Sequence, residues 1–195
     1  MQVLEVIQDG NNYQDARCPG FDQLRTEQWD LDGTTRSAAW SPVQLVVRNP
    51  KARKTHFLTW AGNKFVLTAE QLDDPEFGPI LIRSGELLPI TIDDKEAKLL
   101  NVIPKTDCVD DQKSLWRDNG GTRKRLMKVY FLPDKVPKGK FFKLMHGPAQ
   151  MFIAHFPGEN RLDDFKAIYD RRKCKGLRFR LLWDSDDPSA PVVEF

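Results

Sequence analysis

The stretch from Asp163 to Trp183, DDFKAIYDRRKCKGLRFRLLW, carries the strongest signals for the fold class. Its first half, Asp163 to Lys173, predicts a helix, because acidic residues open it and basic residues close it, as the helix dipole favours. Gly176 follows as a stop signal. The second half predicts a half-buried strand, whose alternating large apolar side chains are expected to point together into the core: Leu177, Phe179, Leu181 and Trp183.

The predicted helix has one apolar side, which we expect to pack on a sheet: Leu162, Phe165, Ile168 and Tyr169. Upstream, Thr68 is expected to cap one more short helix. Apolar runs predict strands at residues 1–8, 42–47, 56–60, 64–67, 80–82, 87–92, 97–103, 141–144 and 150–156. Strands in runs, without long helices between them, predict an α+β fold. We expect a mainly antiparallel sheet of short strands, one or two helices, and the C-terminal helix–strand unit packed on the sheet.

The 195 residues, 40% of them hydrophobic, fit a single domain over 1–195. Residues 1–63 are expected to hold a strand, an irregular excursion and a hairpin. Residues 64–184 are expected to form the rest of the domain, and residues 185–195 a loose acidic tail. The excursion, residues 9–41, is rich in polar and turn-forming residues, and long irregular segments of this kind are often functional.

Bulk properties exclude several classes of protein. No run approaches 18 apolar residues and the N-terminus lacks a basic leader, so we expect neither a membrane span nor a signal peptide. An odd number of widely spaced cysteines favours reduced thiols and therefore a cytoplasmic protein. The spacing of Cys18, Cys108 and Cys174 fits neither a zinc motif nor a disulfide framework. A net charge of +2 does not favour nucleic-acid binding. A nucleic-acid module would need these bases on one face: Lys51, Arg53, Lys54 and Arg123 to Arg125.

An acidic cluster follows the apolar run Leu99-Leu100-Asn101-Val102 and is the main candidate for chemistry. Asp107, Asp110 and Asp111 have the oxygen ligands that Mg²⁺ prefers, which would suit a small metal-dependent hydrolase. The favoured interpretation is that Asp110 and Asp111 sit in a turn, where short acidic side chains accept bonds from nearby backbone N–H groups. We therefore expect no catalytic residues, no metal and no cofactor.

Other polar motifs favour structural roles. Asp30-x-Asp32-Gly33 has the start of a calcium loop but not its later ligands, so a plain turn is expected. The histidines are isolated in the sequence, and structural roles are expected for all three: His56, His146 and His155. The glycines and bases of residues 119–125 follow no predicted strand and open no helix, which argues against a phosphate loop.

The order of three motifs resembles a family of small immunity proteins from bacterial polymorphic toxin systems, the myxobacterial-type immunity domain. The motifs are Gly85-Glu86-Leu87-Leu88-Pro89-Ile90, then Leu99-Leu100-Asn101-Val102 with Asp107, Asp110 and Ser114, then Phe165 with Gly176-Leu177-Arg178-Phe179 and Trp183. The resemblance covers about residues 64–184. It implies a protein that binds and blocks a cognate toxin domain by occlusion, without catalysis.

Partner-binding residues are expected on polar and irregular surfaces, since binding loops sit on rigid scaffolds. The first candidate surface is the acidic segment Asp107, Asp110 and Asp111 with nearby Trp116. The second is the excursion with Trp29 and Trp40. The toxin domain is the only partner expected, and neither a nucleic acid nor a membrane is.

Overall fold

A computed structural model describes residues 1–24, 30–61, 64–118, 124–145 and 147–187. Its strands are β1 (Gln2–Gln8), β2 (Asp15–Arg17), β3 (Val43–Arg48), β4 (Leu58–Trp60), β5 (Lys64–Leu67), β6 (Gly85–Ile92), β7 (Lys95–Val102), β8 (Lys105–Thr106), β9 (Leu115–Asp118), β10 (Lys124–Lys128), β11 (Phe142–Leu144), β12 (Gly147–His155) and β13 (Leu177–Asp184). Its helices are α2 (Ala69–Leu72), α3 (Phe77–Arg83) and α4 (Phe165–Arg171), with 3₁₀ turns η1 (Phe21–Gln23), η2 (Ser37–Ala39) and η3 (Pro133–Lys135). The predicted α+β class is confirmed.

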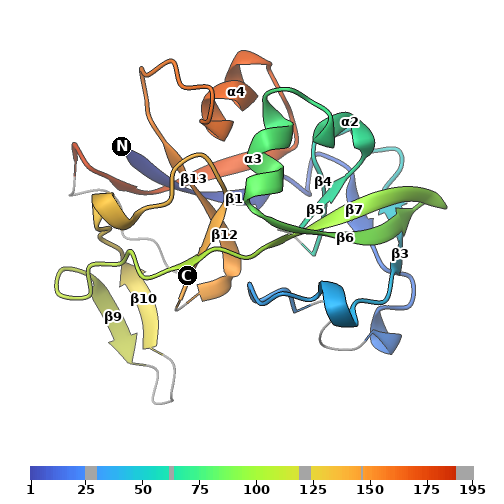
Figure 1. Cartoon of the computed structure of the whole chain (residues 1–195), viewed down its shortest axis with the longest axis horizontal. Helices are drawn as coiled ribbons and strands as arrows, with labels where there is room; N and C mark the ends of the chain where they lie inside the picture. The colour runs from blue at the N-terminus through green and yellow to red at the C-terminus, as the bar shows by residue number, and fades with distance from the viewer. Residues whose placement is uncertain (25–29, 62–63, 119–123, 146, 188–195) are drawn as a thin grey trace.

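Two β assemblies lie side by side (Figure 1). Six strands close into a barrel in the order β2-β3-β6-β7-β5-β4, and five form a sheet in the order β13-β1-β12-β11-β8. A separate hairpin, β9–β10, extends from the sheet side of the molecule. Within the barrel, β6 and β7 pair over eight residues each, and Asp93 and Asp94 turn the chain with φ of 46° and 61°.

The five-stranded sheet has a hydrophobic core against each of its faces, because successive side chains of β12 belong to different cores. Met151 and Ile153 belong to a first core, which fills the space toward the barrel and helices α3 and α4. Phe152 and Ala154 belong to a second core on the opposite face. The first core is rich in aromatic rings; for example, the ring centroids of Phe141 and Phe165 lie 4.7 Å apart.

Strand β13 departs from its predicted pattern at one end. Phe179 and Leu181 pack against the first core, but Trp183 belongs to the second. The cause is an irregularity in the pairing with β1, where the register shifts between Val3 and Leu4. A shift of one residue turns the following side chains to the other face of a sheet. The prediction that all four alternating side chains share one face is therefore wrong for Trp183.

Helix α4 begins two residues later than predicted, because Asp164 acts as its N-cap. The Asp164 carboxylate accepts hydrogen bonds from the backbone N–H groups of Ala167 at 3.0 Å and Phe156 at 2.8 Å. Phe165, Ile168 and Tyr169 are buried in the first core, as predicted. Leu162 lies before the helix and its side chain is exposed, so its predicted place on the apolar side is wrong.

Residues 80–82 form part of helix α3 and not the strand that their β-branched and apolar character predicted. The backbone N–H groups of Glu76 and Phe77 donate to the Asp74 carboxylate, which stabilises the start of the helix. Phe77, Ile80 and Leu81 then fall at helical spacing on the buried side. The short helix α2, with Thr68 and Gln71 forming a capping box, is as predicted.

The two ends of the described chain meet on the sheet. The Met1 ammonium donates to the Ser185 hydroxyl at 2.6 Å, and the Ser185 N–H donates to the Met1 carbonyl at 2.9 Å. Strand β1 therefore lies between β12 and β13, next to the last strand of the fold. Among the residues that the structure describes, none of the helices has the length and apolar character that crossing a membrane requires.

Candidate functional site

The acidic segment after β8 is built as a turn. The Asp110 side chain accepts from the backbone N–H groups of Gln112 and Lys113, both at 3.2 Å, and the Asp110 carbonyl accepts from the Ser114 N–H at 2.9 Å. The Ser114 hydroxyl in turn accepts from the Tyr130 N–H at 3.0 Å. Asp110 and Ser114, both motif residues of the immunity resemblance, thus anchor this turn to the strand region around Tyr130.

The remaining side chains of this segment do not converge on a metal site. Asp107 and Asp111 are exposed, and no group of three or more His, Cys, Asp or Glu residues within the described ranges could hold a metal ion. Trp116 is half-buried and packs against the second core, while its neighbour Leu115 is 57% exposed. This geometry lends no support to the hydrolase alternative.

The second candidate surface, on the excursion, is fixed by two polar residues of barrel strands. The Glu86 carboxylate on β6 accepts from the backbone N–H groups of Arg36 at 2.5 Å and Ser37 at 3.1 Å. The Asn101 amide on β7 is fully buried and donates to the Thr34 carbonyl and to Glu86, both at 2.8 Å. Glu86 and Asn101 lie directly opposite each other on β6 and β7, and both bond to the backbone of residues 34–37. We call this pair of residues the bracket under the loop.

Two lysine side chains of the five-stranded sheet interact with the same loop. The Lys143 ammonium on β11 donates to the buried Leu31 carbonyl, and Lys105 on β8 lies 3.6 Å from the Asp32 carboxylate. The pKa of Asp32 falls to about 2, because hydrogen bonds from Thr34 and the nearby cations outweigh burial, which alone would raise it. Burial, followed by the repulsion of Lys64, lowers the pKa of Lys143 to about 8.

Gly33 fits this arrangement for two reasons. Its φ is +88°, and a Cβ there would lie 2.9 Å from Lys105 Cε and 3.3 Å from Lys143 Cδ. A side chain at this position would be strained and would push against both lysines. The loop therefore joins the barrel to the sheet in one defined conformation.

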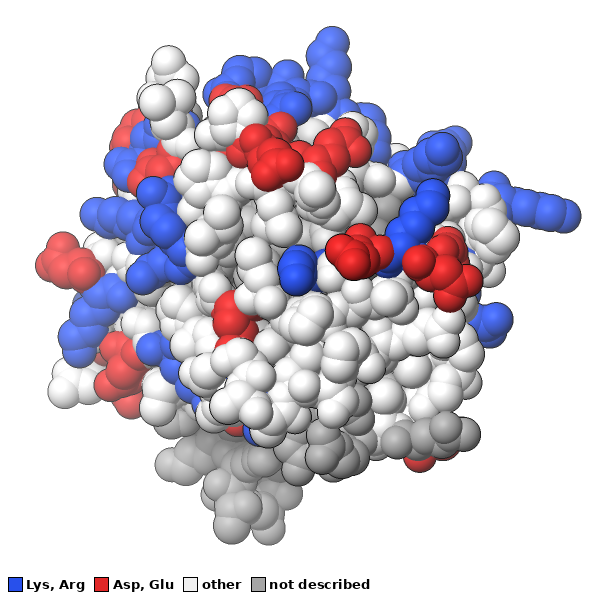
Figure 2. Space-filling model, turned by 45° about the vertical axis from the view of Figure 1, so that its right-hand side comes forward, with Lys and Arg blue, Asp and Glu red and all other residues white. Residues whose placement is uncertain are grey.

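The outer side of this loop is a surface that we name the 34–42 surface. Its exposed residues are all uncharged: Thr34, Thr35, Ser37, Ala38, Ala39, Ser41 and Pro42. Trp40 is half-buried among them, and its indole N–H donates to the Pro89 carbonyl at 2.8 Å. Figure 2 shows a broad area with few charged side chains on the side of the molecule that carries β3, β6 and β7. Trp29, also predicted here, lies outside the described residues.

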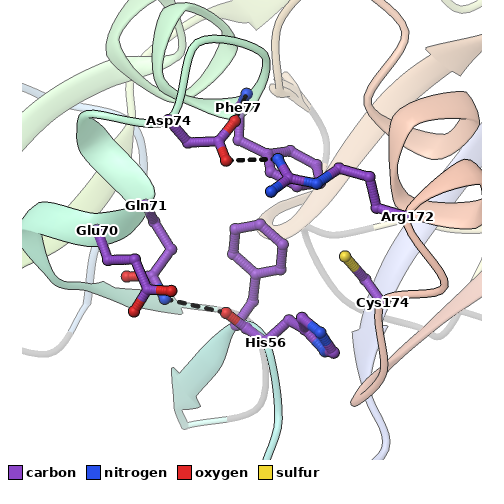
Figure 3. A pocket seen from close by; sticks show the side chains of 8 residues that line it. His56, Glu70, Gln71, Asp74, Phe77, Arg172 and Cys174 are labelled. Atoms are coloured by element: carbon purple, nitrogen blue, oxygen red, sulfur yellow. Dashed lines mark hydrogen bonds and ion pairs between the residues drawn. The ribbon is translucent and has the colours of Figure 1, made fainter.

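A pocket of about 160 Å³ lies between α2, α3 and the segment after α4 (Figure 3). Four of its polar side chains are bonded within the protein: Arg172 pairs with Asp74, Gln71 donates to the His56 carbonyl at 3.1 Å, and His56 Nδ1 accepts from the Lys175 N–H at 2.8 Å. Burial raises the pKa of the Cys174 thiol on its wall, which keeps the thiol protonated. These contacts make the pocket a structural junction.

The basic residues proposed for a nucleic-acid module do not gather on one face. Lys51, Arg53 and Lys54 are exposed on the loop between β3 and β4, beside the barrel. Strand β10, which starts at Lys124, lies at the opposite side of the molecule (Figure 1). Arg123 lies outside the described residues. This separation argues against a single basic groove.

Sequence reasoning missed Glu86, Asn101 and Lys143 as determinants of the candidate surface. All three are polar residues next to apolar residues in a strand, which is a usable signal, but their partners on the loop are 49 to 112 residues away in the chain. A comparison with models of known protein families and a comparison with curated protein sequences find no match for this chain.

Proposed function

We propose that this protein binds a cognate bacterial toxin domain and neutralises it by occlusion, without catalysis. One observation carries the proposal. Glu86 and Asn101, two residues of the motifs that resemble the immunity family, bracket residues 34–37 and so shape the 34–42 surface, on which the one charged residue, Arg36, is half-buried and paired with Asp32. The motif residues thus act together on one exposed loop.

The physical character of the 34–42 surface suits a protein interface. The centre of such interfaces is depleted in charged residues, and large aromatic side chains often serve as anchors. A loop already held by backbone and side-chain bonds loses little conformational freedom when a partner binds, so more of the contact energy remains as affinity. Trp40, fixed by its bond to Pro89, is the anchor we propose.

The acidic segment has a secondary place in this proposal. Exposed Asp107 and Asp111 could steer a basic toxin during encounter, which affects the association rate more than the final affinity. Asp110 is tied up in the turn and contributes to the shape of the segment. The proposed partner contact is therefore centred on the 34–42 surface and not on the acidic segment.

Co-expression tests the proposal directly. The toxin domain encoded next to this gene is expressed in a sensitive strain with the wild-type protein, with Ala38→Arg, or with Ala69→Arg. Both alanines are exposed, but Ala69 lies on α2, away from the 34–42 surface. We expect wild type and Ala69→Arg to restore growth and co-purify with the toxin, and Ala38→Arg to lose both properties. A wild-type protein that neither rescues growth nor co-purifies would refute the proposed function.

A further inference from the structure

The outer edge of the five-stranded sheet is formed by β13. The strand order ends at β13, which pairs with β1 on one side only. Of the described elements, no other strand pairs with it. An edge of eight residues presents backbone donors and acceptors that another extended chain can pair with.

The register with β1 shows which backbone groups point outward. Asp9 N–H donates to the Gly176 carbonyl at 2.9 Å, and in an antiparallel ladder the bonded pairs then recur at every second residue. Arg178 and Arg180 therefore direct their backbone groups toward β1, and Phe179 and Leu181 direct theirs outward. The Leu177 N–H, which follows the outward pattern, donates to the Tyr169 hydroxyl at 2.9 Å instead of to β1.

The side chains of β13 point alternately to the two faces of the sheet. Phe179 and Leu181 pack on the first core, so the two arginines lie on the other face of the strand. Arg180 forms an ion pair with Glu5. Arg178 is exposed, and no ion pair with another described residue accompanies it. A strand added at this edge would place its own side chains beside these arginines.

We propose that the outer edge of β13 is a docking site for an extended, acidic segment of a partner protein. Pairing would use the outward backbone groups of Phe179 and Leu181, and a carboxylate opposite Arg178 would complement its charge, since Arg180 is already paired with Glu5. Charge complementarity across neighbouring strands is favourable, and like charges directly opposite are unfavourable. The site is separate from the 34–42 surface and does not depend on the proposed function.

The unfavourable pairing of like charges on neighbouring strands argues against a second copy of this chain as the occupant. Two-fold antiparallel pairing of β13 with itself can be centred on residue 178, 179 or 180 within the regular part of the strand, because a centre at Leu177 would need its N–H, which donates to the Tyr169 hydroxyl. Each of these registers sets arginine opposite arginine: Arg178 against itself, Arg178 against Arg180, or Arg180 against itself. The register shift beyond Leu181 interrupts the regular edge and disfavours registers centred further along.

The test uses nuclear magnetic resonance on the intact protein with two capped heptapeptides as probes, Val-Glu-Val-Thr-Val-Glu-Val and its lysine counterpart. Without peptide, the amides of Phe179 and Leu181 should exchange with solvent at least ~100-fold faster than those of Arg178 and Arg180. The glutamate peptide should shift the Phe179 and Leu181 resonances saturably, and the lysine peptide should not. Arg178→Glu should reverse this preference, whereas Arg53→Glu, at an exposed arginine elsewhere, should preserve it.

Three results would overturn the proposal. Protected Phe179 and Leu181 amides in the isolated protein would mean that the edge is already covered. Equal binding of both peptides would show that charge does not select the partner, and binding of neither would show that the edge does not accept an added strand. Concentration-dependent dimerisation through β13 in sedimentation experiments, lost in Arg178→Glu, would assign the edge to a second copy.

Discussion

Replacing Lys143 by methionine should change how the stability of this protein depends on pH. Lys143 is only 6% exposed, and its ammonium donates to the Leu31 carbonyl beneath the candidate surface. Burial, and then the positive charge of Lys64, lowers its pKa from 10.5 to about 8. Methionine has a similar length and no charge, so the substitution removes the titration while filling most of the same space.

The sign follows from proton binding. Between pH 8 and pH 10.5 the unfolded chain holds the Lys143 proton and the folded protein releases it, so the free energy of unfolding rises with pH in this window. A difference of this size between the folded and unfolded pKa corresponds to about 3 kcal/mol. Between pH 7 and pH 9 the wild type should gain about 1 kcal/mol relative to Lys143→Met.

Urea denaturation of both proteins at pH 7, 8 and 9 measures this difference. Burial also raises the pKa of the Cys108 thiol, from 9.0 to about 11, which lowers stability above pH 9. That effect is common to both proteins and cancels in the comparison. A difference between wild type and variant that stays constant over the three pH values would refute the reasoning, because it would mean that no buried ammonium titrates there.

Three further substitutions test the supports of the fold. Asp164→Ala should lower the free energy of unfolding by about 3 kcal/mol, because three donors, from Ala167, Phe156 and His155, lose their acceptor. Burial opposes ionisation of Asp164, but bonds from these groups hold its pKa below the ordinary value, so the stability advantage of the wild type should decrease as the pH falls below about 4. An undiminished advantage at pH 2 would contradict the assignment. Trp183→Ala should cost about 3–5 kcal/mol in thermal or chemical unfolding, and a cost below about 1 kcal/mol would show that the indole is not packed in the second core. Asn101→Ala should cost about 1–3 kcal/mol and accelerate amide exchange at Arg36 and Ser37; unchanged exchange there would disprove the bracket under the loop.

Local signals in the sequence were sufficient where a structure depends on neighbouring residues. The β6–β7 hairpin follows from two apolar runs around Asp93-Asp94, and α2 from the Thr68 cap. Helix α4 follows from its charged ends and its apolar spacing. Each of these elements is determined within about a dozen residues, which is the range over which propensity and periodicity are informative.

Features that depend on distant residues were not predictable in this way. The parallel pairings of β2 with β4 and of β3 with β6 close the barrel, and no local pattern indicates them. The face on which Trp183 lies depends on a register shift opposite Val3 and Leu4, at the other end of the chain. The candidate surface also depends on distant residues. Trp40 was proposed from the composition of the excursion, but the bracket formed by Glu86 and Asn101 is apparent only from the pairing of the strands.

The adjacency of Met1 and Ser185 has a consequence for synthesis of the protein. Strand β1 is synthesised before the other described strands, yet both of its neighbours, β12 and β13, lie beyond residue 146. The first core cannot close until β12 and β13 have been made, so β1 lacks both of its partner strands while the barrel strands are synthesised. Contacts of such long sequence separation slow folding and leave apolar strands open to aggregation, so this chain should depend on chaperones more than a protein of its size with local topology.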